Sequence, residues 1–207
     1  MNKTYIMVTG PAASGKSTLC KNLTETLPAY FYKPSYAYFE LANKHNIPKE
    51  KMFELVPPEE AVNHFCDVCQ KHLITLGDQH LAIQPKRDSA IATNSTTDID
   101  VKEPYTKALD YALFDKLNYF GIEPIIIYLK ANPEILFERA HKRHIETGFV
   151  LRNKTKEEVI DEILAEEYYF NELITKKHLE NFIINTESLN EEHTHLLVKK
   201  RILERKK

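Results

Sequence analysis

The residues best suited to chemistry lie near the start of the chain, in the segment Gly10-Pro-Ala-Ala-Ser-Gly-Lys-Ser. They fit the pattern GxxxxGK[ST], in which glycines let the backbone curve so that successive N–H groups converge on phosphate oxygens. The segment follows an apolar, β-rich stretch and precedes leucines at helical spacing, so a helix N-terminus would also face the anion. We therefore predict a phosphate-binding loop at residues 10–18.

Within this loop the side chains have separate expected roles. Lys16 would reach the β- and γ-phosphates of a nucleotide, and the hydroxyl of Ser17 would bind Mg²⁺. Thr18 would lie near the α-phosphate. The predicted nucleotide-binding residues are Gly10, Pro11, Ala12, Ala13, Ser14, Gly15, Lys16, Ser17 and Thr18. The alternative is an ordinary glycine-containing turn between a strand and a helix.

A second set of candidates is a group of arginines in the second half of the chain. Arg139 and Arg143 stand four residues apart in a predicted helix, so their guanidinium groups can converge on one anion. Arg152 is a third candidate. Such positive charge suits phosphoryl transfer, in which negative charge spreads over the migrating oxygens. The alternative is that these arginines pair with nearby glutamates on a solvated helix surface.

The phosphate loop and the segment YLKANPEILFERAHKR at 128–143 together resemble the P-loop kinases of small molecules, the nucleoside and nucleoside-monophosphate kinase group. In that family a strand is typically followed by a helix that begins with Pro-Glu, ends in an Arg-x-x-x-Arg pair and leads into a lid. The resemblance implies ATP and Mg²⁺ as cofactors, a short lid at about 141–154, and a loop at 185–188 that packs on the adenine. It implies catalytic roles for Lys16, Arg139, Arg143 and Arg152.

The resemblance leaves the second metal ligand and the catalytic base open. Many members end their third strand with an acidic residue, whereas the segment that we take as this strand, 88–93, has none at its end. Asp98, in the polar loop that follows, is our candidate for the Mg²⁺ carboxylate; capping of a turn is its alternative role. Lys33 follows the second strand where nucleoside kinases often carry a glutamate base, and Glu40 is a spare candidate for that base.

Strands and helices alternate along the chain. Strands are expected at 4–9, 29–32, 88–93, 124–129 and 181–185, and helices at 16–27, 35–81, 105–120, from 132 onward, 155–179 and 191–207. Such alternation indicates an α/β fold. We predict one P-loop kinase domain over residues 1–207, a three-layer sandwich with a central, mostly parallel five-stranded sheet. Its helices at about 35–81 would cover the acceptor.

Length and composition bound the class of protein. A chain of 207 residues, 43% hydrophobic and 28% charged, is typical of one globular domain. No apolar run approaches the roughly 20 residues of a membrane helix, and the N-terminus does not resemble a signal peptide, so we expect a cytoplasmic protein. The net charge of −2 argues against a broad surface for nucleic acid.

We expect transfer of the γ-phosphoryl group of ATP to a small-molecule acceptor, a nucleoside or nucleotide before other metabolites. One alternative is a nucleotide-hydrolysing switch or ATPase that acts with a protein partner. GTP specificity in such switches usually needs an Asn/Thr-Lys-x-Asp-like element, and none is evident in the sequence. The other alternative is a polynucleotide 5′-end kinase, which would need a basic groove. The identity of the acceptor and the oligomeric state stay open at this point.

Overall fold

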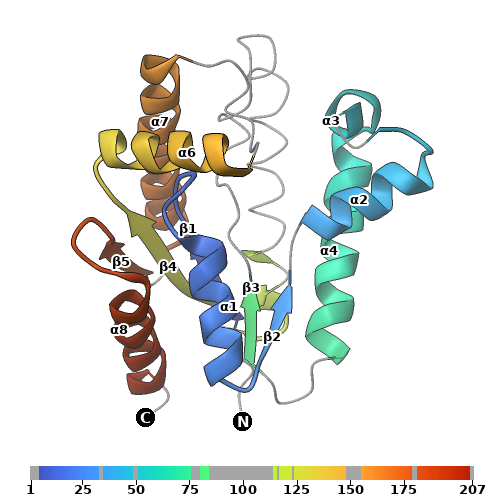
Figure 1. Cartoon of the computed structure of the whole chain (residues 1–207). Helices are drawn as coiled ribbons and strands as arrows, with labels where there is room; N and C mark the ends of the chain where they lie inside the picture. The colour runs from blue at the N-terminus through green and yellow to red at the C-terminus, as the bar shows by residue number, and fades with distance from the viewer. Residues whose placement is uncertain are drawn as a thin grey trace.

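The strands form a parallel sheet with the first strand at its centre. The computed structural model describes residues 5–32, 35–48, 51–75, 80–83, 114–115, 117–122, 124–147, 155–178 and 181–205. The strands are β1 (Tyr5–Thr9), β2 (Ala29–Tyr32), β3 (His80–Ile83), β4 (Pro124–Lys130) and β5 (Asn181–Asn185), in the order β2-β3-β1-β4-β5 (Figure 1). Every neighbouring pair is parallel. The predicted α/β fold with a parallel sheet is confirmed.

Helices cover both faces of this sheet (Figure 1). They are α1 (Lys16–Thr26), α2 (Ser35–Lys44), α3 (Met52–Leu55), α4 (Pro58–Thr75), α6 (Pro133–Thr147), α7 (Lys156–Lys177) and α8 (Glu191–Glu204). Within the described ranges, none of the helices combines the length and the apolar character needed to span a bilayer.

Successive residues of β1 pack into two different cores. Tyr5 and Met7 belong to a buried cluster shared with α2, α3, α4 and α7, whereas Ile6 and Val8 belong to one shared with α1 and α8. All five residues of the strand are buried, which is typical of a parallel strand covered on both faces. We call the two sides of the sheet the α4/α7 face and the α1/α8 face.

The third strand differs from the sequence prediction. We expected helix to about residue 81, but α4 ends at Thr75 and β3 occupies His80–Ile83, between β1 and β2. Leu81 and Ala82 are good helix formers, so the local sequence favours a helix. Pairing of β3 with β1 on one side and β2 on the other overrides that preference. The strand expected at 88–93 lies outside the described residues.

The starts of α6 and α7 agree with the sequence signals. The hydroxyl of Thr155 accepts a hydrogen bond from the N–H of Glu158 at 3.2 Å, and the Glu158 carboxylate accepts one from the N–H of Thr155 at 2.7 Å. This capping box fixes where α7 begins.

The first residues of the predicted lid, 141–147, belong to α6. Residues 148–154 lie outside the described part of the chain, so the lid stays a prediction.

Candidate functional site

The predicted phosphate loop connects β1 to α1, at the edge of the sheet where the parallel strands end. Gly10 has a φ of 131° and lies against β4, so that a Cβ atom there would be 2.1 Å from the carbonyl oxygen of Leu129. Gly15, with a φ of 96°, is the N-cap of α1, and Ala13 also has a positive φ. The first glycine of the motif is therefore required by its close approach to β4 and by its backbone conformation.

The polar groups of this loop suit an anion. Lys16 is buried, and its ammonium group donates a hydrogen bond to the carbonyl oxygen of Pro11 at 2.7 Å. The buried hydroxyl of Ser14 has no hydrogen-bond partner in the part of the chain that the structure describes. Ser17 is exposed and Thr18 is half-buried in the first turn of α1. A helix N-terminus, a buried cation and an unsatisfied hydroxyl together can bind phosphate oxygens.

A pocket of about 310 Å³ opens beside the loop on the α1/α8 face. The loop residues Ala13, Ser14 and Gly15 form one end of it, and Leu19, Leu129 and Leu189 form apolar walls. Ligand pockets typically have volumes of about 300 to 1,000 Å³ and are mainly apolar with a few polar groups. The phosphate loop and this pocket are therefore continuous, as the phosphates and the base of one nucleotide would require.

Arg139 contributes to the wall of this pocket. Its Nη1 donates to the hydroxyl of Thr186 at 3.2 Å and its Nη2 to the Thr186 carbonyl at 2.8 Å. Thr186 in turn donates to the Lys130 carbonyl through its N–H at 2.8 Å and its hydroxyl at 3.2 Å. Arg143, one turn further along α6, is exposed and is not part of the pocket lining. Arg152 lies outside the described residues.

The pocket also includes residues that the sequence analysis missed. We expected residues 185–188 to pack on the base, and Thr186 does line the pocket, but Asn190, Glu191 and Thr194 line it as well. Asn190 is the N-cap of α8, with its Oδ1 accepting from the N–H of His193 at 2.8 Å. A helix start directly after the expected base loop is the sequence signal that could have pointed to these residues.

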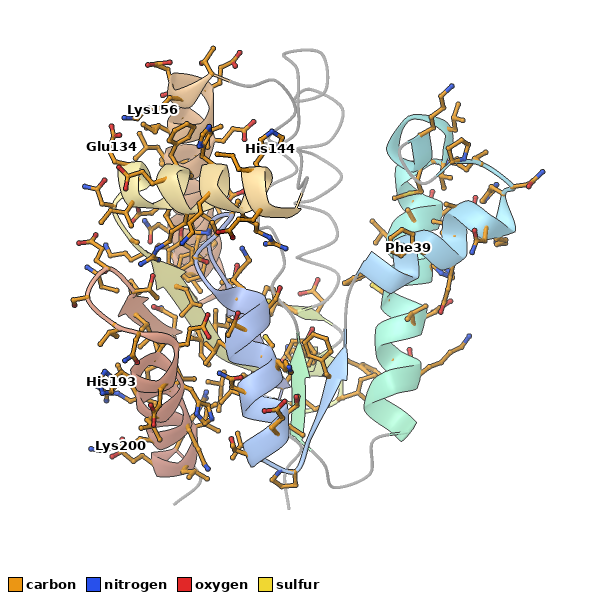
Figure 2. All side chains as sticks on the ribbon, in the orientation of Figure 1. Phe39, Glu134, His144, Lys156, His193 and Lys200 are labelled. Atoms are coloured by element: carbon orange, nitrogen blue, oxygen red, sulfur yellow. The ribbon has the colours of Figure 1, made fainter. Side chains whose placement is uncertain are left out.

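The start of α7 is joined to the start of α6. The Lys156 ammonium pairs with the Glu134 carboxylate (Figure 2). It also lies 5.9 Å from the centroid of the Phe137 ring. The hydrogen bond from Lys156 to Glu134 raises the pKa of Lys156. His144 lies toward the opposite end of α6 (Figure 2). The described residues on the two sides of 148–154 therefore lie at the two ends of α6.

Of the three remaining candidates, Glu40, Lys33 and Asp98, only Glu40 belongs to the described residues. Glu40 is exposed on α2, with its carboxylate 3.7 Å from Nε2 of His64. Lys33 and Asp98 lie outside the described residues. Within those ranges there is no group of three or more histidine, cysteine or acidic side chains placed to hold a metal ion. Ser17 is thus the described residue that we predict to bind Mg²⁺.

The carboxylate of Glu60 connects α2 and α4 on the α4/α7 face of the sheet. Glu60 of α4 accepts hydrogen bonds from Nζ of Lys44 at 2.9 Å and from Nε2 of His45 at 2.8 Å. The bond from Lys44, followed by that from His45, holds the pKa of Glu60 below its usual value. These contacts join the end of α2 to the beginning of α4 as one unit.

Cys20 lies one helical turn after Lys16, and its thiol is expected to be unreactive in the folded protein. Burial raises the pKa of Cys20 to about 12, with the nearby charge of Lys16 only partly opposing it. Because the thiolate is the nucleophile, iodoacetamide at pH 8 should leave Cys20 unmodified until the protein is denatured. Mass spectrometry of labelled peptides tests this, and modification of Cys20 in the native protein within minutes would contradict it.

Comparison with known proteins adds information on the fold. No protein-family model matches the sequence, and no curated protein matches it. Shikimate kinase from Acinetobacter baumannii in complex with shikimate is 16% identical, with 99% of this chain and 95% of that chain covered and a TM-score of 0.58. Deoxyadenosine kinase from M. mycoides with bound dCTP is 16% identical (97% and 99% covered, TM-score 0.57).

A further similar structure is the YorR protein from Bacillus subtilis in complex with phosphorylated GDP, at 21% identity, 96% and 95% coverage and a TM-score of 0.58. At such identities the likeness shows the fold, and it extends over almost the whole of each chain. The protein therefore has the fold of the P-loop kinases of small molecules, as the sequence predicted.

Proposed function

We propose that the chain is a single P-loop kinase domain that transfers the γ-phosphoryl group of ATP to a small molecule, most directly a nucleoside or nucleotide. The observation that carries this proposal is the continuity between the loop that holds Lys16 and the pocket beside it. The named kinases of similar fold, whose structures contain shikimate and dCTP, support a small-molecule acceptor.

In this proposal the phosphate loop binds the triphosphate. Lys16 leaves the Pro11 carbonyl and binds the β- and γ-phosphates, and Ser17 holds Mg²⁺. The bound Mg²⁺ would neutralise charge that develops on the phosphate oxygens. The hydroxyl of Ser14, which is buried and has no hydrogen-bond partner within the described ranges, would donate a hydrogen bond to a phosphate oxygen.

In this proposal Arg139, Arg143 and Arg152 have two different roles. The two hydrogen bonds to Thr186 hold Arg139 at the base end of the pocket, so we assign it to the base, on which a guanidinium can stack. Arg143 and Arg152, nearer to or within the predicted lid, act on the transferring phosphoryl group. Closure of the lid would keep water from competing with the acceptor.

The acceptor would enter on the other side of the phosphate loop. In the sheet, β2 and β3 lie on one side of β1, and β4 and β5 lie on the other, so the strand order reverses at β1. In open α/β sheets, ligands bind outside the carboxyl ends of the strands at such a reversal of strand order. The donor pocket lies on the α1/α8 face, which leaves the space near α2 and α4 for the acceptor.

The experiment that tests this function is ADP formation from ATP and Mg²⁺ across a panel of nucleosides, nucleoside monophosphates and metabolite alcohols. We expect ADP to form above the no-acceptor control with one acceptor class. Equal turnover in every reaction, or turnover only when a protein or an oligonucleotide is added, would instead support the switch or the polynucleotide kinase.

The position of β3 changes the expected metal carboxylate. We chose Asp98 because the third strand was expected at 88–93, but β3 ends at Ile83, and Asp88 is the first acidic residue after it. We therefore expect Asp88→Asn to raise the Mg²⁺ concentration for half-maximal turnover about tenfold or more. Asp98→Asn is the matched comparison, and we expect a change below about twofold. The reverse result would return the assignment to Asp98.

A further inference from the structure

The first turn of α8 forms a polar end of the donor pocket, and its hydrogen bonds decide which atoms are left for a ligand. Oδ1 of Asn190 accepts from the N–H of His193 at 2.8 Å. The Asn190 carbonyl accepts from the N–H of Thr194 at 3.0 Å and from its hydroxyl at 2.9 Å. What remains is the side-chain NH₂ of Asn190, the carboxylate of Glu191 and the lone pairs of the Thr194 hydroxyl.

Outside the phosphate loop and this turn, the polar residues that line the pocket are Arg139 and Thr186. Arg139 and Thr186 bind each other, and Thr186 also binds Lys130. The leucines of the pocket offer contact area and no hydrogen bonds. Because we assign Arg139 to stacking on the face of the base, we assign the edge of the base to the remaining polar residues that line the described part of the pocket: Asn190, Glu191 and Thr194.

Two of these three groups only accept hydrogen bonds. An ionised Glu191 has no proton to donate, and the Thr194 hydroxyl has given its single proton to the Asn190 carbonyl. Thr194 is 6% exposed, so this acceptor lies deep in the lining. Asn190 supplies the complementary donor, its side-chain NH₂.

Guanine matches this set better than adenine does. Its N1–H and N2–H₂ groups are adjacent donors that one carboxylate accepts together, and its O6 accepts from an amide NH₂. Adenine offers a single amino group beside N1, an acceptor that would face the carboxylate oxygens. A site built to bind a donor discriminates strongly against an analogue that lacks it.

We propose that the donor pocket binds guanine nucleotides, and that Glu191 is the residue that favours guanine over adenine. The inference rests on the proposed function, because that function places the donor base in this pocket, and it changes the preferred phosphoryl donor of that function from ATP to GTP. The carboxylate of Glu191 accepts from N1–H and N2–H₂, while Asn190 donates to O6.

The test is equilibrium binding of GDP and of ADP, with Mg²⁺, to the full chain by calorimetry. Glu191→Gln removes the charge and one of the two acceptors, and we expect it to weaken GDP binding tenfold or more and ADP binding less than twofold. Glu192→Gln is the matched control, since Glu192 is exposed in the same turn and lies outside the pocket lining. It should change neither affinity more than twofold.

The outcomes separate the two proposals. A GDP-to-ADP affinity ratio that Glu191→Gln leaves unchanged, or that Glu192→Gln changes equally, overturns the role of Glu191 while the kinase proposal stands. Failure of both nucleotides to bind the wild-type chain would overturn the proposed function and this inference together. Equal unfolding temperatures of the two variants and the wild type show that the affinities compare folded proteins.

Discussion

Lys16→Ala is expected to lower the rate of phosphoryl transfer by about a thousandfold or more. The ammonium group lies in the loop that would surround the phosphates, 2.7 Å from the Pro11 carbonyl, and no other lysine is in the loop. Its charge is needed most in the transition state, when negative charge accumulates on the bridging and equatorial oxygens. The measurement is ADP formation at saturating acceptor, once the acceptor panel has identified one.

Lys21→Ala is the control for this experiment. Lys21 lies on the same helix, but it is exposed and forms an ion pair with Glu25 at 3.9 Å, four residues further on. Its removal should change turnover by less than twofold and stability very little. If the Lys16 variant retains more than a tenth of the wild-type rate, the assignment of this loop to phosphoryl transfer is wrong.

Gly10→Ala should destabilise the folded protein by about 4 kcal/mol or more. Its Cβ would lie 2.1 Å from the Leu129 carbonyl oxygen, far inside contact distance, at a backbone φ of 131° that side chains rarely adopt. The obstacle is backbone in the centre of the sheet, so β1 and β4 would have to separate for the side chain to fit. Urea unfolding followed by circular dichroism measures the loss.

Gly15→Ala separates the effect of conformation from that of overlap. Gly15 also has a positive φ, 96°, but a Cβ there meets no atom within 4 Å. Its cost should be about 1 to 2 kcal/mol, the usual penalty for a left-handed backbone. If the two variants lose equal stability, the approach of the loop to β4 is not what requires Gly10.

The elements with local signals were predictable from the sequence. The loop between β1 and α1 has a fixed pattern of residue types, and the capping box of Thr155 and Glu158 depends on residues three positions apart. β4 is a continuous β-branched and apolar run. In each case neighbouring residues determine the conformation, so that the position of the element could be inferred directly.

The features that depend on distant residues were not predictable in this way. β3 is four residues long and is defined by pairing with β1 and β2. The binding of Arg139 to Thr186 could not be inferred either, because the spacing of Arg139 and Arg143 on a helix does not show which distant groups each of them meets. The polar end of the pocket depends on α8 folding back against α1.

The central place of β1 has a consequence for how the protein is made. β1 leaves the ribosome before the other four strands, yet its two neighbours in the sheet begin at His80 and Pro124. Until those strands have been synthesised, its apolar side chains and backbone groups have no partners in the sheet. Packing of the phosphate loop against Leu129 therefore waits until β4 has been synthesised, and during that time the apolar side chains of β1 are open to non-native contacts.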